Sequence, residues 1–442
     1  MIDYVPWYLG NGGDHSFLFG WFPSHSILVF LATEIHFVAR LQRMNKCFIL
    51  DGSMSIVDRL KGTAMSTEFD RYRALFPVTE RFAFLSHAAI SPLNTRLTAA
   101  VQTELEQAQQ LPFTRYYPRM LAIFKTMRDR IATLINARSV EELVMMPNTA
   151  AGLNTAAQSL PLSAGDNILV LDGDYPANIY PWLNLASKGV FTKFVPQKQG
   201  GLDIAALEAR IDRRTRVIAL STVMFATGFR NDIEAVGKLC RAHGIYFVVD
   251  GIQSLGAIPM DVQAYNIDFL ACGSQKWLLS APGAGFLYCR EEILDDLVAG
   301  AYVGASSVVD ANNYLDYNFT FPHSAERFNL GTPNVMGATA LNAALGMLLE
   351  VGIEKIQRRI EILVDTLIND LTERGYNLAA STEAAHRSGI VVAQVPDPPI
   401  ALHRLQDAGI IATLRGSGVR FAPHFYNTTE EVMRVGEVLG DA

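Results

Sequence analysis

A carboxylate and a lysine follow two neighbouring apolar segments in the middle of the chain. Residues 245–249 (IYFVV) and 267–272 (IDFLAC) are apolar runs typical of buried parallel strands. Asp250 ends the first run, and Lys276 lies just beyond the second. Because open α/β sheets bind ligands at the carboxyl ends of their parallel strands, we expect both side chains to lie in one ligand-binding cleft.

An acid and an amine in one apolar cleft suit the chemistry of pyridoxal phosphate. This cofactor needs a lysine amine for a Schiff base and an acidic group that keeps its ring nitrogen protonated, so that the ring accepts carbanion electrons. Partial desolvation lowers the pKa of such a lysine and frees its amine as a nucleophile. A surface salt bridge at the sheet edge is the competing interpretation, and the two residue types alone favour it.

A candidate phosphate site precedes this region and shifts the balance towards a cofactor. Residues 142–146 predict a strand, and the segment 147–152 (PNTAAG) then opens a helix. A helix N-terminus offers free N–H groups and a partial positive charge, small residues such as Ala150 let the backbone approach an anion, and Thr149 adds a hydroxyl. An ordinary Asn or Thr N-cap is the simpler interpretation of this motif by itself.

The motifs around the acid and the lysine resemble the core signature of the class V aminotransferase family of pyridoxal phosphate enzymes. The resemblance rests on DGIQS from Asp250, on Lys276 and on PGAGFLY at 282–288, and it covers the chain from residue 69 to the C-terminus. It implies an α/β protein of fold type I, with a mostly parallel seven-stranded sheet in a large domain and a smaller α+β domain. The family includes cysteine desulfurases, selenocysteine lyases, kynureninases and isopenicillin N epimerases.

The resemblance assigns further residues to the cofactor. Tyr175 stands where the family has an aromatic residue, often histidine, that stacks on the ring. Phe225 replaces the asparagine of desulfurase-like members, which leaves Gln253 as the partner of the ring hydroxyl. Gln275 replaces the histidine that often precedes the lysine, and either Ser274 or Gln275 is expected to contact the phosphate. A loop tyrosine and a helix-cap amide are the simpler interpretations of Tyr175 and Gln253.

Three residues are expected to contact the substrate. Arg420 matches the family arginine that binds the substrate α-carboxylate, because a planar guanidinium pairs with both oxygens and stays charged; Arg415 is a second candidate. His87 belongs to a segment that lines the family's substrate pocket, and a packed turn histidine is an equally supported interpretation. Asn178, in the loop that carries Tyr175, completes the set.

The turn at 331–334 (GTPN) implies an oligomer. In the resembling family this turn belongs to the neighbouring subunit, where its threonine reaches the cofactor phosphate. Thr332 is therefore expected to bind a partner's cofactor, in a homodimer with shared active sites. A proline-stabilised turn before a helix is the simpler interpretation.

We divide the chain into four parts. Residues 1–64 form an N-terminal extension, 65–85 a segment that packs on the small domain, 86–330 the large cofactor-binding domain and 331–442 the small domain. The apolar stretch at 17–38 is interrupted by polar residues and follows no basic segment, so it predicts neither a membrane span nor a signal peptide. We favour Met65, followed by STEFDRYRALFP, as the natural translation start.

Composition excludes several classes of protein. The 442 residues are 50% hydrophobic, which suffices for a large two-domain subunit. A net charge of −7 without a basic block disfavours nucleic-acid binding. The four cysteines show no paired spacing, so we predict neither a metal site nor a disulfide framework, and a reducing cytoplasm is the simplest compartment.

The sequence thus predicts a pyridoxal phosphate enzyme that acts on an amino acid through a Schiff base with Lys276. That lysine is expected to remove the α-proton while Asp250 keeps the ring protonated, in an aminotransferase or C–S lyase of class V. Desulfurases carry a nucleophilic cysteine before the arginine strand, and none lies between Arg415 and Arg420. An epimerase similar to isopenicillin N epimerase, a desulfurase or selenocysteine lyase without that cysteine, and lastly a non-enzymatic binding module are the alternatives.

Overall fold

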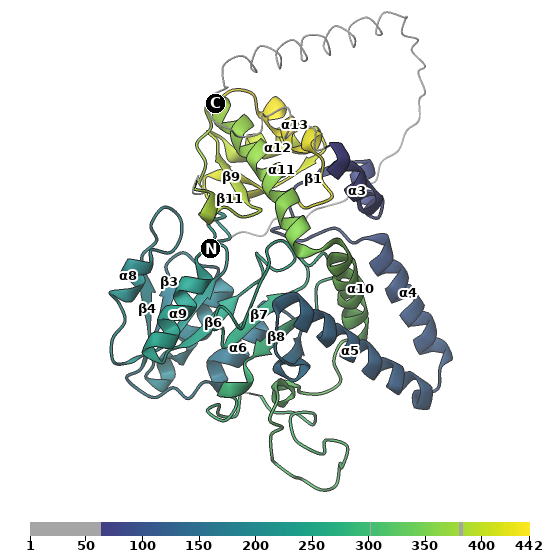
Figure 1. Ribbon diagram of the computed structural model, residues 1–442, viewed down its shortest axis with the longest axis vertical. Coiled ribbons are helices and arrows are strands. Elements are labelled where there is room, and N and C mark those ends of the chain that lie inside the picture. The colour runs from purple at the N-terminus through teal and green to yellow at the C-terminus, as the bar shows by residue number, and fades with distance from the viewer. Residues whose placement is uncertain (1–62, 301, 380–382) are drawn as a thin grey trace, which may run out of the picture. The chain divides into compact units, whose positions relative to one another are not determined.

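The computed structural model describes residues 63–300, 302–379 and 383–442, of which Ala64–Ala442 form one compact unit (Figure 1). The expectations for the segment 17–38 and for Cys47 lie outside the described residues. In the part that is described, no single helix is long and apolar enough to cross a membrane. Helices α10 (Val335–Val351) and α11 (Ile353–Glu373) pass that test only as a pair, which is bent by 79°.

A seven-stranded sheet forms the centre of the larger part of the fold. Its strand order is β2-β8-β7-β6-β5-β3-β4. Strands β3 to β7 pair in parallel, whereas β8 is antiparallel to both of its neighbours. The mostly parallel seven-stranded sheet of the prediction is confirmed. The strands are β2 (Leu143–Met146), β3 (Asn167–Leu171), β4 (Phe191–Val195), β5 (Thr215–Ser221), β6 (Tyr246–Asp250), β7 (Phe269–Gly273) and β8 (Gly285–Cys289).

Both faces of this sheet are buried, which explains why its strands are continuous apolar runs in the sequence. Successive residues of a strand point to opposite faces. Along β6, Phe247 and Val249 belong to one core cluster and Val248 to the other. The helices of this region are α6 (Thr149–Ser159), α7 (Tyr180–Leu183), α8 (Ile204–Glu208) and α9 (Ile233–His243).

Three long helices pack on one another beside the sheet (Figure 1). They are α4 (Thr95–Gln110), α5 (Phe113–Ile135) and α10 (Val335–Val351). Pro118 lies within the first half of α5. A proline in a helix removes one backbone hydrogen bond and normally marks a helix boundary.

The C-terminal part combines an antiparallel sheet with three helices. The sheet has the order β11-β12-β9, and a short parallel pair joins β1 to β10. Near the N-terminal end of the unit, Phe69 and Tyr72 of α3 place their rings 5.7 and 5.8 Å from the ring of Phe425. The elements are α3 (Thr63–Arg73), β1 (Ala83–Phe84), α11 (Ile353–Glu373), β9 (Val391–Gln394), α12 (Pro398–Asp407), β10 (Ile410–Ile411), β11 (Thr413–Arg415), β12 (Gly418–Phe421) and α13 (Thr429–Leu439).

Short 3-10 turns complete the fold. They are η1 (Pro77–Glu80), η2 (Val140–Glu142), η3 (Pro176–Asn178), η4 (Asn184–Lys188), η5 (Glu291–Ile293), η6 (Ala325–Phe328) and η7 (Ala384–His386). Among the described residues of the segment 300–321 there is no helix or strand.

A glycine allows helix α6 to approach the sheet closely. A Cβ atom on Gly152 would lie 2.9 Å from the Cβ atom of Ala271 on β7, closer than such atoms normally come. This contact holds the N-terminus of α6 beside the carboxyl end of β7, where the predicted phosphate site lies.

Gly152→Ala therefore tests the close packing of α6. Helix propensity alone would make this change stabilising by about 1 kcal/mol, whereas overpacking costs about 1–3 kcal/mol, so we expect a net loss in the free energy of unfolding. Denaturant titration measures it. Gly331→Ala is the control, because no atom lies within 4 Å of the added methyl group. A stabilised Gly152→Ala protein would contradict the close contact.

Candidate active site

The sheet places Asp250 in its interior, at the carboxyl end of β6. Asp250 lies between Ser221 of β5 and Ala271 of β7 in the strand register and is 1% exposed. Its Oδ1 atom accepts a hydrogen bond of 2.9 Å from the backbone N–H of Ile252. Its Oδ2 atom is buried and has no hydrogen-bond partner. Burial raises the pKa of this carboxyl, and the nearby carboxylate of Asp174 adds to that effect.

Lys276 lies within electrostatic reach of this carboxyl, as the sequence predicted. Burial lowers the pKa of the lysine amine, the carboxylate of Asp250 opposes that change, and the cation of Arg420 reinforces it. The Nζ atom lies 5.5 Å from the centre of the Tyr175 ring, which is 43% exposed. The ring of Phe225 meets Tyr175 edge-on, with centroids 5.1 Å apart. The amine therefore lies near an aromatic ring, and its pKa is lower than that of an ordinary lysine.

A second buried carboxylate, which the sequence analysis missed, anchors the loop that carries Tyr175. Asp174 accepts hydrogen bonds from the backbone N–H of Tyr175 (2.6 Å), from the backbone N–H and hydroxyl of Ser221 (3.0 and 2.6 Å), and from the side chain of Asn178 (3.0 Å). An acid directly before the aromatic residue was the available sequence signal. These bonds tie the loop to β5.

Asn178 supports this loop. Its side chain is fully buried and its amide donates to Asp174. Its Oδ1 atom is buried without a hydrogen-bond partner, so its predicted role as a substrate contact stays a prediction.

The predicted phosphate site is assembled around Gly273, at the end of β7. The hydroxyl of Thr149 accepts a hydrogen bond of 2.8 Å from the Gly273 N–H. Asn148 caps α6 by accepting from the Ala151 N–H, so the N–H groups of Thr149 and Ala150 have no acceptor within the helix. A Cβ atom on Gly273 would lie 2.6 Å from the Oε1 atom of Gln275. A side chain at this position would therefore displace the end of the Gln275 side chain.

Ser274 and Gln253, which were predicted to contact the cofactor, make hydrogen bonds within the protein. The hydroxyl of Ser274, which is fully buried, donates to the carbonyls of Ala281 and Ala284, so Ser274 cannot be the phosphate contact that we considered for it. Gln275 is half-buried and is the one of the two that can reach a ligand. Gln253 donates to the Ala88 carbonyl (3.1 Å) and accepts from the indole N–H of Trp277 (3.0 Å), and one of its amide hydrogens is left for a ring hydroxyl.

His87 is a core residue, and its predicted substrate contact is wrong. It is 0% exposed, and its Nδ1 atom lies 2.7 Å from the Ala422 carbonyl. A carbonyl only accepts, so Nδ1 carries the proton and Nε2 accepts from the Tyr426 hydroxyl at 2.7 Å. Burial lowers the pKa of His87 to about 4. The packed turn histidine of the alternative interpretation is what the structure contains.

Arg420 presents an unsatisfied guanidinium edge. The side chain is 1% exposed, and its Nη1 atom donates to the Phe225 carbonyl at 2.9 Å. Its Nε and Nη2 atoms are buried without a partner. These two atoms form the edge of a guanidinium that pairs with both oxygens of a carboxylate. Burial, and then the cation of Arg415, lower the pKa of Arg420 to about 9.

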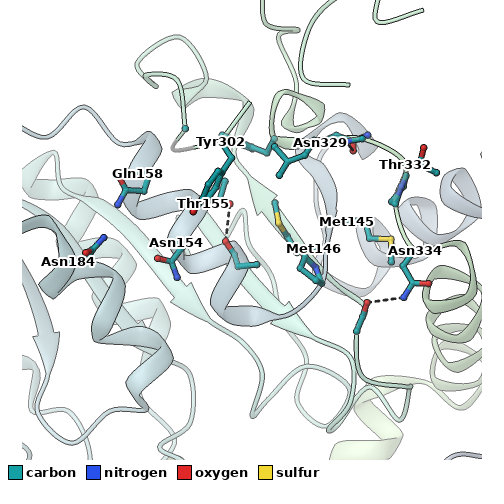
Figure 2. A pocket seen from close by; sticks show the side chains of 18 residues that line it. Met145, Met146, Asn154, Thr155, Gln158, Asn184, Tyr302, Asn329, Thr332 and Asn334 are labelled. Carbon is teal, nitrogen blue, oxygen red and sulfur yellow. Dashed lines mark hydrogen bonds between the residues drawn. The ribbon is translucent and has the colours of Figure 1, made fainter. Parts of the chain in front are cut away.

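Thr332 lies apart from these residues within one chain. It is exposed and lines a cavity of about 590 Å³, whose described walls also include Asn154, Asn184 and Tyr302 (Figure 2). Neither Lys276 nor Arg420 lines that cavity. The contact of Thr332 with a partner's cofactor therefore stays a prediction.

The described cysteines offer no accessible nucleophile. Cys240, Cys272 and Cys289 are all free and buried. Burial raises the pKa of the Cys272 thiol well above its ordinary value, and Asp250 adds to that effect. Among the residues that the structure describes, no cluster of His, Cys, Asp or Glu is arranged to hold a metal ion.

A buried acid and a desolvated lysine at the carboxyl edge of a mostly parallel sheet, with an unpaired arginine on β12 of the second sheet, are typical of an α/β enzyme of pyridoxal phosphate fold type I. The family model "Aminotransferase class-V" matches residues 83–435, and the chain belongs to this family of transferases and lyases. The family and the enzyme class predicted from the sequence are therefore confirmed.

Individual relatives agree with this assignment. The chain is 29% identical over 375 residues to the uncharacterized aminotransferase YcbU of Bacillus subtilis, covering 82% of this chain and 95% of the relative. It is 30% identical over 339 residues to a cysteine desulfurase of Klebsiella pneumoniae subsp. pneumoniae, covering 71% and 81%. The apo structure of a cysteine desulfurase from Thermococcus onnurineus NA1 superposes with a TM-score of 0.76 at 26% identity, covering 83% and 96%.

The buried state of His87 predicts a pH dependence of stability. The unfolded chain binds a proton at His87 below pH 6.5, and the folded chain does so only below about pH 4. Stability should therefore fall as the pH falls through this window, by up to about 1.4 kcal/mol per pH unit for this group. Urea unfolding at several pH values measures the slope.

His87→Phe should flatten that slope even though it lowers stability at neutral pH. The exposed His243 provides the matched control, and His243→Phe should keep the parent slope. An unchanged slope in His87→Phe would remove the buried, neutral state assigned to this histidine.

Proposed function

We propose that this chain binds pyridoxal phosphate at Lys276 and acts at the α-carbon of an amino acid. The buried, unpartnered Oδ2 atom of Asp250 carries the proposal, because a ring N–H is the kind of donor that it lacks. When bound, the cofactor supplies an aldehyde that reacts with amines and a ring that accepts the electrons of a carbanion.

The residues at the carboxyl ends of β6 and β7 fit the parts of this cofactor. Asp250 would accept the hydrogen bond of the ring nitrogen. The free N–H groups of Thr149 and Ala150 and the amide of Gln275 would hold the phosphate, as helix N-termini do for anions. Tyr175, fixed by its anchored loop, would cover one face of the ring and exclude water.

Two cationic residues then act on the substrate. The Nε and Nη2 atoms of Arg420 would orient the α-carboxylate. Since desolvation favours the uncharged amine of Lys276, its Nζ atom can accept the α-proton near neutral pH and return it. The position to which the proton returns separates transamination from epimerisation, whereas elimination requires that a group leave the β- or γ-carbon of the substrate.

Transamination or C–S lysis is the reaction type that we favour. The loop between β11 and β12, at Gly416 and Ser417, contains no cysteine. The three described cysteines are buried, which leaves no thiol of the described residues to receive a sulfur atom. A desulfurase that works through an enzyme cysteine has no support in this part of the chain.

Visible absorbance tests the cofactor site. The purified protein should absorb visible light after incubation with pyridoxal phosphate, and borohydride should abolish that band. Lys276→Ala should lack the band because the covalent link is lost, whereas the exposed, ion-paired Lys238→Ala should retain it. A colourless parent protein that refuses the added cofactor would refute the proposal.

Asp250→Ala tests the role of the acid. The variant should still bind cofactor but lose turnover by about 10²-fold or more, because the protonated ring is no longer stabilised. An amino-acid panel assayed for keto acid, sulfide and inverted stereochemistry identifies the reaction. Turnover equal to that of the parent protein would remove the role assigned to Asp250.

We also propose that the active form is a homodimer. The segment 302–319 exposes large apolar side chains, with Tyr314, Leu315 and Tyr317 exposed by 73%, 90% and 92%. Contiguous exposed apolar residues are typical of a surface that another chain covers. A second copy would also bring Thr332 to a cofactor, as the family resemblance implies.

Light scattering tests the dimer. The parent chain should have twice the mass of one subunit, and Leu315→Asp combined with Tyr317→Asp should shift it towards the monomer. Ile400→Asp, at a position 59% exposed on α12, is the matched control and should stay dimeric. A monomeric parent protein with full activity would contradict the proposal.

A further inference from the structure

We propose that the substrate is an amino acid whose side chain carries a second acidic group, and that Arg415 binds this group while Arg420 binds the α-carboxylate. The inference rests on the proposed function and names its substrate class. It starts from the geometry of the hairpin formed by β11 and β12.

The strand register places both arginines on one face of this hairpin. Arg420 lies opposite Thr413, and Arg415 lies opposite Gly418. Residues directly opposite each other in an antiparallel pair share a face, and so do residues two apart on one strand. Arg415 therefore shares the face of Thr413 and of Arg420.

Neither guanidinium is neutralised by the protein. Arg415 is half-buried; its Nη1 atom donates to the Leu414 carbonyl at 2.7 Å, and its Nε atom is buried without a partner. Across the described ranges, no carboxylate lies within salt-bridge distance of Arg415 or Arg420. Burial lowers the pKa of Lys276 and the cations of Arg420 and Arg415 both lower it further, so the two guanidiniums and the lysine amine lie within electrostatic reach of one another. Partly buried cations without a counter-ion are unfavourable, which makes this face a site for anions.

The number of unsatisfied cations indicates the charge of the ligand. A neutral amino acid brings one carboxylate, which Arg420 pairs through its Nε and Nη2 atoms. Arg415 would then stay unpaired beside it. A side-chain carboxylate or sulfinate would supply the second anion, because both present planar or pyramidal oxygens to a guanidinium.

Binding of simple acids tests this without turnover. Calorimetric titration of the cofactor-loaded protein should show succinate binding about 10-fold tighter than propionate or more, because a second charged hydrogen-bonded pair forms. Arg415→Met should reduce the affinity for succinate to that for propionate. Arg434→Met, which changes an exposed arginine on α13, is the matched control and should bind succinate like the parent.

Two substrate pairs that differ in the acidic group give the second readout, and aspartate and asparagine also have nearly the same shape. The ratio of kcat/KM for aspartate over asparagine, and for cysteine sulfinate over cysteine, should exceed one in the parent and fall in Arg415→Met. The first pair tests a carboxylate and the second a sulfinate. Retention of the visible band shows that the variant is folded and loaded.

Two outcomes would overturn the inference. Equal affinities for succinate and propionate in the parent would show that no second acid is bound. An equal loss of succinate and propionate binding in Arg415→Met would instead assign Arg415 to the α-carboxylate. Failure of the cofactor proposal is recognised separately, because the visible band would then be missing from every variant, whatever the acids show.

Discussion

The site depends on a buried carboxylate in the sheet interior, one of whose two oxygen atoms has no hydrogen-bond donor. Asp250 has one satisfied oxygen and one without a donor. A buried acceptor without a donor costs about 1–3 kcal/mol, which the packing of the surrounding strands must offset. A buried oxygen atom without a donor is typical of a site where a bound ligand supplies the missing hydrogen bond.

The cationic residues of the site also have buried hydrogen-bonding atoms without partners. Arg420 is buried with two free donor atoms, and Arg415 lies on the same hairpin face. Lys276 is driven towards its uncharged form by burial and by Arg420. The acid at the sheet edge and the cations near the hairpin come from segments far apart in the chain. A zwitterionic ligand with additional negative charge would satisfy both groups together.

Rigid supports surround this unsatisfied core. Asp174 receives hydrogen bonds from the Tyr175 loop and from Ser221, so the aromatic residue beside Lys276 is held to the sheet. Gln253 holds the indole of Trp277 directly after the lysine. Asp174 and Gln253 thus position the residues around Lys276, whereas the free atoms of Asp250 and Arg420 are left for a ligand.

The sequence by itself determined the sheet, the acid and the lysine. Strands buried on both faces are continuous apolar runs, and parallel strands end at one edge, so Asp250 and Lys276 could be placed together from spacing alone. Only the tertiary structure decided which polar residues remain free. His87 and Ser274 have the residue types of ligand contacts, but their hydrogen bonds are made within the core by partners such as Tyr426 and Ala284. Hydrogen-bond partners distant in the chain leave no periodic signal in the sequence, and for that reason the folded structure was needed.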